Sequence, residues 1–135
     1  MRLFDTTFLI DLIDGDKGAK ALAERIDNEH GFNAISAVTV QEYLRGVYYL
    51  FSSSKVLKTK LERAESELRY FEIIPYSYDI ARIAASIDAE LARKGMIIGM
   101  ADIIIAATAL HLGLSVVTRD EEDFRRIQKI RVETY

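Results

Sequence analysis

Cysteine is missing from this sequence of 135 residues, and histidine occurs only twice. Without cysteine the chain can form neither a disulfide framework nor a thiolate metal site, which fits a reducing compartment. The spacing of His30 and His111 matches no pattern of paired ligands. Zinc prefers nitrogen and sulfur ligands, so we expect no zinc site, and any bound metal ion would depend on carboxylate oxygens.

Long hydrophobic runs are missing as well. Asp5 and Asp11 interrupt the apolar start of the chain, so we expect no signal peptide, and Asp102 breaks the longest apolar stretch. That stretch is too short to cross a bilayer. Half of the residues are hydrophobic and 29% are charged, as in folded globular domains. We expect a cytoplasmic protein with no membrane partner, folded as a single domain over residues 1–135.

The chain also lacks an excess of positive charge, since its formal net charge is −3. This argues against broad nucleic-acid binding through a basic surface, although an acidic site that holds divalent metal ions can still act on nucleic acid. Basic side chains gather in two groups, and each group on its own is expected to be a solvated helix face. The first group is Lys55, Lys58, Lys60 and Arg63, and the second is Arg119, Arg125, Arg126 and Lys129.

Hydrophobic periodicity and turn residues predict strands that alternate with helices. The expected strands cover 2–4, 33–35, 71–74, 114–118 and 131–133, and the expected helices cover 7–13, 18–28, 38–51, 55–70, 78–94, 100–112 and 121–127. Ser77 is expected to cap one helix, and Gly95 and Gly113 are each expected to end one. The alternation predicts an α/β fold in three layers, with a mostly parallel central sheet flanked by helices.

Carboxylates occur where this fold can bring them together. Asp5 directly follows the first strand, and Asp120 follows the strand at 114–118. Glu42 lies one turn into the helix after the second strand, and Asp102 lies in the first turn of a helix that is otherwise almost wholly apolar. The carboxyl ends of parallel strands share one edge of the sheet, so acids from four distant segments can converge there.

Such a cluster has a physical cost, because like charges at close range raise each other's pKa and destabilise the folded state. Mg²⁺ or Mn²⁺ would offset this cost, since both take several oxygen ligands. Taken one at a time, the acids have simpler explanations. Asp5 and Asp120 can cap helices, Asp102 can favour a helix N-terminus, and Glu42 can be a surface residue. Their coincidence at one sheet edge makes a shared site the better interpretation.

Three segments resemble the PIN-domain family, in particular the VapC-type toxins of prokaryotic toxin–antitoxin pairs. They are LFDTTFLIDL at residues 3–12, ISAVTVQEYLRGV at residues 35–47 and GMADIIIAATALHLGLSVVTRDEEDF at residues 99–124. The acids also follow in the order of the family over residues 1–127. One short acidic motif would be weak support, whereas an ordered set over nearly the whole chain is specific. The sequence departs from the family pattern at Thr7, where many relatives carry Asn or Ser. Threonine keeps a hydroxyl at this position, so we expect the departure to have a small effect.

The resemblance implies a PIN fold and an endoribonuclease that depends on Mg²⁺ or Mn²⁺. Cleavage would be an in-line hydrolysis of RNA without a covalent protein nucleophile. We favour Asp120 over Asp123 as the fourth acid because Asp120 is nearer to the end of its strand. Carried over by position, the catalytic and metal-binding residues are Asp5, Glu42, Asp102 and Asp120, with Thr6, Thr118 and Asp123 in supporting positions.

The resemblance also implies partners: an RNA substrate, a VapB-type antitoxin that blocks the site, and a second copy of the chain in a homodimer. We expect Val47 and Leu61 in the core and part of the run 48–51 exposed or at an interface, because that run is bulkier than one buried helix face requires. The apolar and aromatic side chains available for such contacts are Tyr43, Val47, Tyr48, Leu50, Phe51, Leu57, Leu61 and Leu68.

Other protein classes match less well. A phosphohydrolase of the haloacid-dehalogenase type needs a second Asp two residues after the first, where Thr7 stands. A receiver-type signalling domain needs an early acid pair and a late lysine, and a dinucleotide-binding domain needs a glycine-rich turn after its first strand. Two alternatives stay open. One is a non-catalytic PIN-like module that binds RNA or protein, for which loss of an acid is expected, and the other is a stand-alone RNA-processing nuclease.

Overall fold

A central sheet of five parallel strands organises the computed structural model, which describes residues 1–135. The strands are β1 (Arg2–Phe4), β2 (Asn33–Ser36), β3 (Glu72–Ile74), β4 (Ser115–Val117) and β5 (Val132–Glu133). They lie in the order β3-β2-β1-β4-β5. The chain proceeds from β1 to β3 on one side and then returns to place β4 on the other side of β1. Ligand sites in open parallel sheets form at such a reversal, beyond the carboxyl ends of the strands.

Side chains of the central strands alternate between the two faces of the sheet. Residues in register on one face belong to one hydrophobic cluster, and their chain neighbours belong to a second cluster on the other face. Each of these side chains has at most 1% of its surface exposed. Burial on both faces explains why these central positions of the strands are all apolar. One face carries Leu3, Ala34 and Val116, and the other carries Phe4, Ile35 and Val117.

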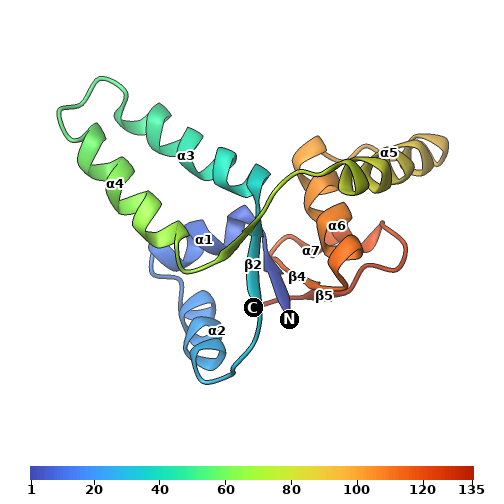
Figure 1. Ribbon diagram of the computed structural model, residues 1–135, viewed down its shortest axis with the longest axis horizontal. Helices are drawn as coiled ribbons and strands as arrows, with labels where there is room; N and C mark the ends of the chain where they lie inside the picture. The colour runs from blue at the N-terminus through green and yellow to red at the C-terminus, as the bar shows by residue number, and fades with distance from the viewer.

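Helices cover both faces, as Figure 1 shows. One face packs against α5 (Tyr78–Arg93), α6 (Met100–Leu112) and the short α7 (Glu121–Arg125). The other packs against α1 (Thr6–Ile13) and α2 (Lys17–Asp27). The pair α3 (Ala37–Phe51) and α4 (Leu57–Leu68) extends away from the sheet as a helical hairpin. The three-layer α/β prediction is confirmed, the sheet is wholly parallel, and every predicted segment is found with its ends shifted by at most two residues.

The boundaries of α5 and α6 follow from local chemistry. The Ser77 hydroxyl accepts a hydrogen bond from the backbone N–H of Ile80 and caps α5, as predicted. Gly113 ends α6 in the left-handed region with φ of 68°, a conformation that favours glycine. No helix of the protein combines the length and apolar character needed to cross a membrane.

Two glycine substitutions test this description of the helices. Gly113→Ala forces a Cβ into the left-handed region, so we expect it to lower the free energy of unfolding by about 1 kcal/mol. Gly46→Ala lies inside α3 with open space around its Cα, so it should raise that free energy by up to about 1 kcal/mol. Urea unfolding of both variants measures the difference. Equal effects of both substitutions would contradict the assigned end of α6.

Candidate active site

Asp5 lies at the carboxyl end of β1, next to the point where the strand order reverses. Its backbone N–H donates to the Val117 carbonyl at 3.1 Å, which continues the ladder to β4. Its Oδ1 accepts hydrogen bonds from the Thr7 hydroxyl at 2.7 Å and from the Phe8 N–H at 3.1 Å. Asp5 is therefore the N-cap of α1, as predicted for this residue taken on its own. Only 4% of Asp5 is exposed, and this burial raises its pKa, whereas hydrogen bonds from Thr118 and Thr7 lower it.

Glu42 reaches the same edge from α3. Ser36 caps this helix by accepting from the Val38 N–H, so α3 begins directly where β2 ends. The Glu42 Oε1 accepts a hydrogen bond of 2.7 Å from the Thr6 hydroxyl at the start of α1. Glu42 also adds to the raised pKa of Asp5 through charge repulsion. The predicted supporting residue Thr6 thus contacts one of the predicted acids.

Asp102 joins these acids from the first turn of α6. Its side chain is half-buried, and its pKa is raised to about 6. Burial is the largest cause, and repulsion from Asp5, Glu42, Asp123 and Asp120 adds to it. Carboxylates from four distant segments therefore lie close enough to affect one another.

Asp120 precedes α7 but does not cap it, because its side chain makes no capping hydrogen bond. Its backbone N–H donates to the Thr118 hydroxyl at 3.0 Å. Asp123, one turn later, forms an ion pair of 3.6 Å with Arg126. Asp123 contributes more than Asp120 to the raised pKa of Asp102, but its charge already has a partner, whereas that of Asp120 has none.

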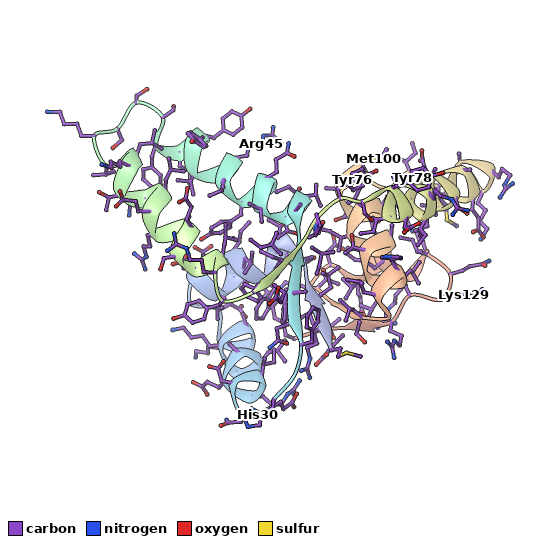
Figure 2. The ribbon with its side chains drawn as sticks, in the orientation of Figure 1. His30, Arg45, Tyr76, Tyr78, Met100 and Lys129 are labelled. Atoms are coloured by element: carbon purple, nitrogen blue, oxygen red, sulfur yellow. The ribbon has the colours of Figure 1, made fainter.

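Basic side chains do not neutralise this edge. None of the ten ion pairs in the protein includes Asp5, Glu42, Asp102 or Asp120. In the second basic group, Arg125 pairs with Glu121 and Arg126 with Glu122 along α7. Figure 2 places His30 at the lower edge of the molecule, below α2 and well away from Arg45 on α3. The edge therefore carries carboxylates without a cationic partner.

The donor set fits Mg²⁺ or Mn²⁺ in chemistry, because it consists of carboxylate oxygens whose repulsion a cation would relieve. As placed, however, no three Asp, Glu or His side chains converge on one point as a metal-binding group. Repulsion between unneutralised carboxylates favours such separation. Rotation of side chains is needed before several of them can contact a single ion.

A groove of about 480 Å³ runs beside this edge, between α1, α3 and α4. Glu42 lies in its lining, so the groove opens next to the acids. Val47, expected in the core, is half-buried and lines the groove instead. Sequence reasoning did not single out Ile10 and Ile13, which also line it and are 46% and 42% exposed. The available signal was that α1 is apolar on more sides than its contact with the sheet requires.

Comparison with known proteins identifies this arrangement. The model of the PIN domain matches residues 2–130. The chain belongs to the PIN-domain family. Within that family it is 31% identical to ribonuclease VapC1 of Rickettsia felis over 98% of this chain and 94% of the relative. It is 32% identical to the tRNA(fMet)-specific endonuclease VapC of Salmonella typhimurium over 84% of this chain and 83% of the relative.

Solved structures agree with this membership in the PIN family. The DNA-bound VapBC complex of Salmonella typhimurium contains a chain that matches with a TM-score of 0.86 and 31% identity, over 98% of this chain and 96% of that one. A chain in the FitAcB structure from Neisseria gonorrhoeae matches with a TM-score of 0.81 and 30% identity, over 98% and 96% respectively. The expected VapC-type membership is confirmed, and nucleases of the PIN family in general depend on divalent metal ions.

The raised pKa of Asp102 makes a stability prediction with a definite sign. Between about pH 4 and pH 6 the folded protein keeps a proton that the unfolded chain has released, so Asp102 destabilises the fold above pH 6. A shift of this size corresponds to about 3 kcal/mol before screening, and partial exposure reduces it to about 1 kcal/mol. In EDTA at pH 7.5, Asp102→Asn should therefore raise the melting temperature by about 3 °C.

The same substitution should give little or no gain at pH 4.5, where most of this penalty is absent. Asp88→Asn is the matched control, because Asp88 is exposed on α5 and takes part in no ion pair. Differential scanning fluorimetry at both values of pH supplies the measurement. A loss of stability in Asp102→Asn at pH 7.5 would show that Asp102 stabilises the fold and would contradict the penalty assigned to its burial and to repulsion.

Proposed function

We propose that this protein is the toxin of a VapBC-type toxin–antitoxin pair and hydrolyses phosphodiester bonds in RNA. Its PIN-family membership and its similarity to relatives named ribonuclease and endonuclease support this function. The observation that carries the catalytic part is the environment of Asp102, a half-buried carboxyl among four other acids. Such an arrangement costs stability, which is typical of functional sites. We further propose that residues 1–135 act as one PIN domain in the cytoplasm.

Asp5, Glu42, Asp102 and Asp120 are the proposed ligands of Mg²⁺ or Mn²⁺. Ions held there would polarise the scissile phosphate, lower the pKa of a water molecule and stabilise the leaving oxygen. The protein itself contributes orientation. The Thr6 hydroxyl restrains Glu42, and the hydroxyls of Thr7 and Thr118 restrain Asp5, so the first two acids keep a limited set of rotamers.

A VapB-type antitoxin is the proposed protein partner, since relatives of this chain are found in VapBC and FitAcB structures. The groove beside Glu42 is suited to a partner segment with both apolar and charged side chains. It offers apolar contacts at Ile10, Ile13 and Val47, together with the charged groups of Lys60 and Arg63. A segment bound there would lie next to the acids and could block access of RNA to them.

A homodimer stays a prediction. The expected exposure within the run 48–51 is confirmed, because Tyr48, Tyr49 and Leu50 are 52%, 73% and 78% exposed. Tyr78, the first residue of α5, and Met100, the first residue of α6, are also exposed. Figure 2 shows both along the same upper side of the view as Arg45, which lies on α3. These surfaces are available to a second copy of the chain or to RNA.

Cleavage assays test the proposed activity. Purified protein should cleave RNA in the presence of Mg²⁺ or Mn²⁺, and EDTA should abolish this cleavage. Mapping of the new RNA ends begins to define the target. Asp5→Asn and Asp102→Asn should each reduce the rate by at least about 100-fold, because each removes a charged oxygen from the proposed metal site. Melting temperatures of both variants establish that they are folded.

Asp88→Asn, on the exposed face of α5, is the matched control and should cleave like the wild type. Equal residual cleavage by the wild type and the folded Asp5→Asn variant would indicate a contaminating nuclease. That outcome, or binding of RNA with no cut on any RNA, would favour the non-catalytic PIN-like module over an enzyme.

Substitution of Asp120 and of Asp123, which lie three residues apart, tests which of the two is the fourth acid of the site. Asp120 has no ion-pair partner, and Asp123 is paired with Arg126. We therefore expect Asp120→Asn to lower the cleavage rate by about 100-fold or more and Asp123→Asn by about 10-fold or less. Rates measured at several Mn²⁺ concentrations make the comparison. The reverse order would assign the metal-binding role to Asp123.

A further inference from the structure

Arg119 connects three separate parts of the protein. It lies directly before Asp120 in the segment after β4. Its Nε lies 3.3 Å from Asp11 Oδ2 on α1, and its terminal nitrogen lies 2.5 Å from Asp16 Oδ2. Asp16 in turn caps α2 by accepting from the Ala19 N–H at 2.8 Å. The Arg119 charge is thus directed to α1 and α2, so the adjacent Asp120 remains without a cationic partner.

Tyr135, which follows β5, completes this set of contacts. Its hydroxyl donates to Asp11 Oδ2 at 2.6 Å, the same oxygen that faces Arg119. The Arg119 guanidinium carbon lies 5.3 Å from the centroid of the Tyr135 ring, within cation–π range. The same ring makes an edge-to-face contact with Phe8, at a centroid separation of 5.3 Å. We call the three side chains Arg119, Asp11 and Tyr135 the clasp.

The space around Tyr135 is also restricted by the backbone. A Cβ added to Gly18 at the start of α2 would lie 3.3 Å from the backbone carbonyl carbon of Tyr135. This distance is tighter than ordinary van der Waals contact. The absence of a side chain at Gly18 therefore lets Tyr135 approach α2 and reach Asp11.

The clasp is linked to the acids on both of its sides. On one side, Thr7 lies next to the Tyr135 hydroxyl and donates to Asp5 at 2.7 Å. Burial and the bond to Asp11 raise the pKa of Tyr135, and Thr7 opposes them. On the other side, Arg119 stands between Thr118, whose hydroxyl lowers the pKa of Asp5, and Asp120, whose N–H donates to that hydroxyl at 3.0 Å. The clasp therefore joins the segment that carries Asp5 to the segment that carries Asp120.

We propose that the clasp is a positioning device that holds Asp5 and Asp120 at a fixed separation within the acidic edge, and so strengthens divalent-cation binding between them. This inference rests on the proposed function. Without the clasp, the strand ladder still holds Asp5 beside Val117, but Asp120 lies beyond the end of that ladder and can move away from the other acids. Such movement relieves its repulsion with Asp102 in the metal-free protein. Binding of the ion would then have to supply the free energy that brings the acids back together, so its affinity would be lower.

A purely structural role predicts a different result. The Arg119 side chain is 51% exposed, and its carboxylate partners are 22% and 28% exposed. Exposed ion pairs of this kind contribute little to folding stability, because solvent screens them. The clasp should therefore affect cation affinity much more than the melting temperature of the metal-free protein.

Calorimetric titration of Mn²⁺ into the full chain, without RNA, tests the proposal. Arg119→Gln should weaken Mn²⁺ binding by about 10-fold, and Tyr135→Phe, which removes only the hydroxyl, should weaken it by a smaller factor. The double variant should lose less than the product of the two factors, because both substitutions break the same device. Arg119→Lys keeps the charge and should recover part of the affinity. In cleavage assays, Arg119→Gln should need more Mn²⁺ but approach the wild-type kcat at saturation.

Arg125→Gln is the matched control, since Arg125 is 57% exposed on α7 and pairs with Glu121 outside the clasp. It should leave Mn²⁺ binding unchanged. If the wild type binds Mn²⁺ and cleaves RNA, unchanged Mn²⁺ affinity in both Arg119→Gln and Tyr135→Phe would overturn the role of the clasp and leave the proposed function standing. A large drop in the melting temperature of both variants in EDTA would also overturn it in favour of a structural role. Absence of Mn²⁺ binding by the wild type would overturn the clasp together with the metal-dependent function.

Discussion

Repulsion between carboxylates at one edge of the sheet is the constraint on which the rest of this structure depends. Four segments that are distant in sequence each bring an acid there, and burial together with repulsion from the other acids raises the pKa of Asp102 to about 6. The parallel sheet makes this convergence unavoidable, because all its strands end at the same edge. Its apolar faces hold the strands in register, and the stability that they provide must offset the electrostatic cost of the acids.

The protein restrains these acids without neutralising them. Threonine hydroxyls donate to Asp5 and Glu42 and limit their rotation without adding charge. Nearby arginines pair with other acids: Arg126 pairs with Glu122 and Asp123, and Arg119 pairs with Asp11 and Asp16. The negative potential of the edge is thereby preserved for a cation. Such preorganised charge is the common property of hydrolytic sites that use divalent metals.

The location of the acids could be predicted from the sequence because it follows from local rules. Asp5 stands after a short strand that ends in two apolar residues, and Asp102 stands at the start of a helix that is otherwise almost wholly apolar. Both positions were therefore predictable once the sheet was taken as parallel. The role of Asp120 was less accessible. Its position favours a helix cap, and only the structure shows that its side chain makes no capping bond.

Long-range pairings could not be predicted, because no local pattern encodes them. Tyr135 and Asp11 are 124 positions apart, and their contact depends on how β5 joins the sheet beside β4. The ion pairs of Arg119 with Asp11 and Asp16 also join residues that are distant in sequence. The sequence therefore showed Arg119 only as one of a group of basic residues and did not indicate its partners. The groove beside Glu42 likewise depends on the angle at which α3 and α4 leave the sheet, which side-chain periodicity does not specify.

A crystal structure of the protein soaked in Mn²⁺, with anomalous diffraction recorded to locate the manganese, tests the central claim most directly. Binding at the acidic edge predicts manganese within coordination distance, roughly 2.1 to 2.2 Å, of carboxylate oxygens of both Asp5 and Asp102. It also predicts that these side chains turn towards a common point, which they do not share in the present structure. Ordered carboxylates with no manganese between them at saturating concentration, or manganese only at other surfaces, would contradict the claim.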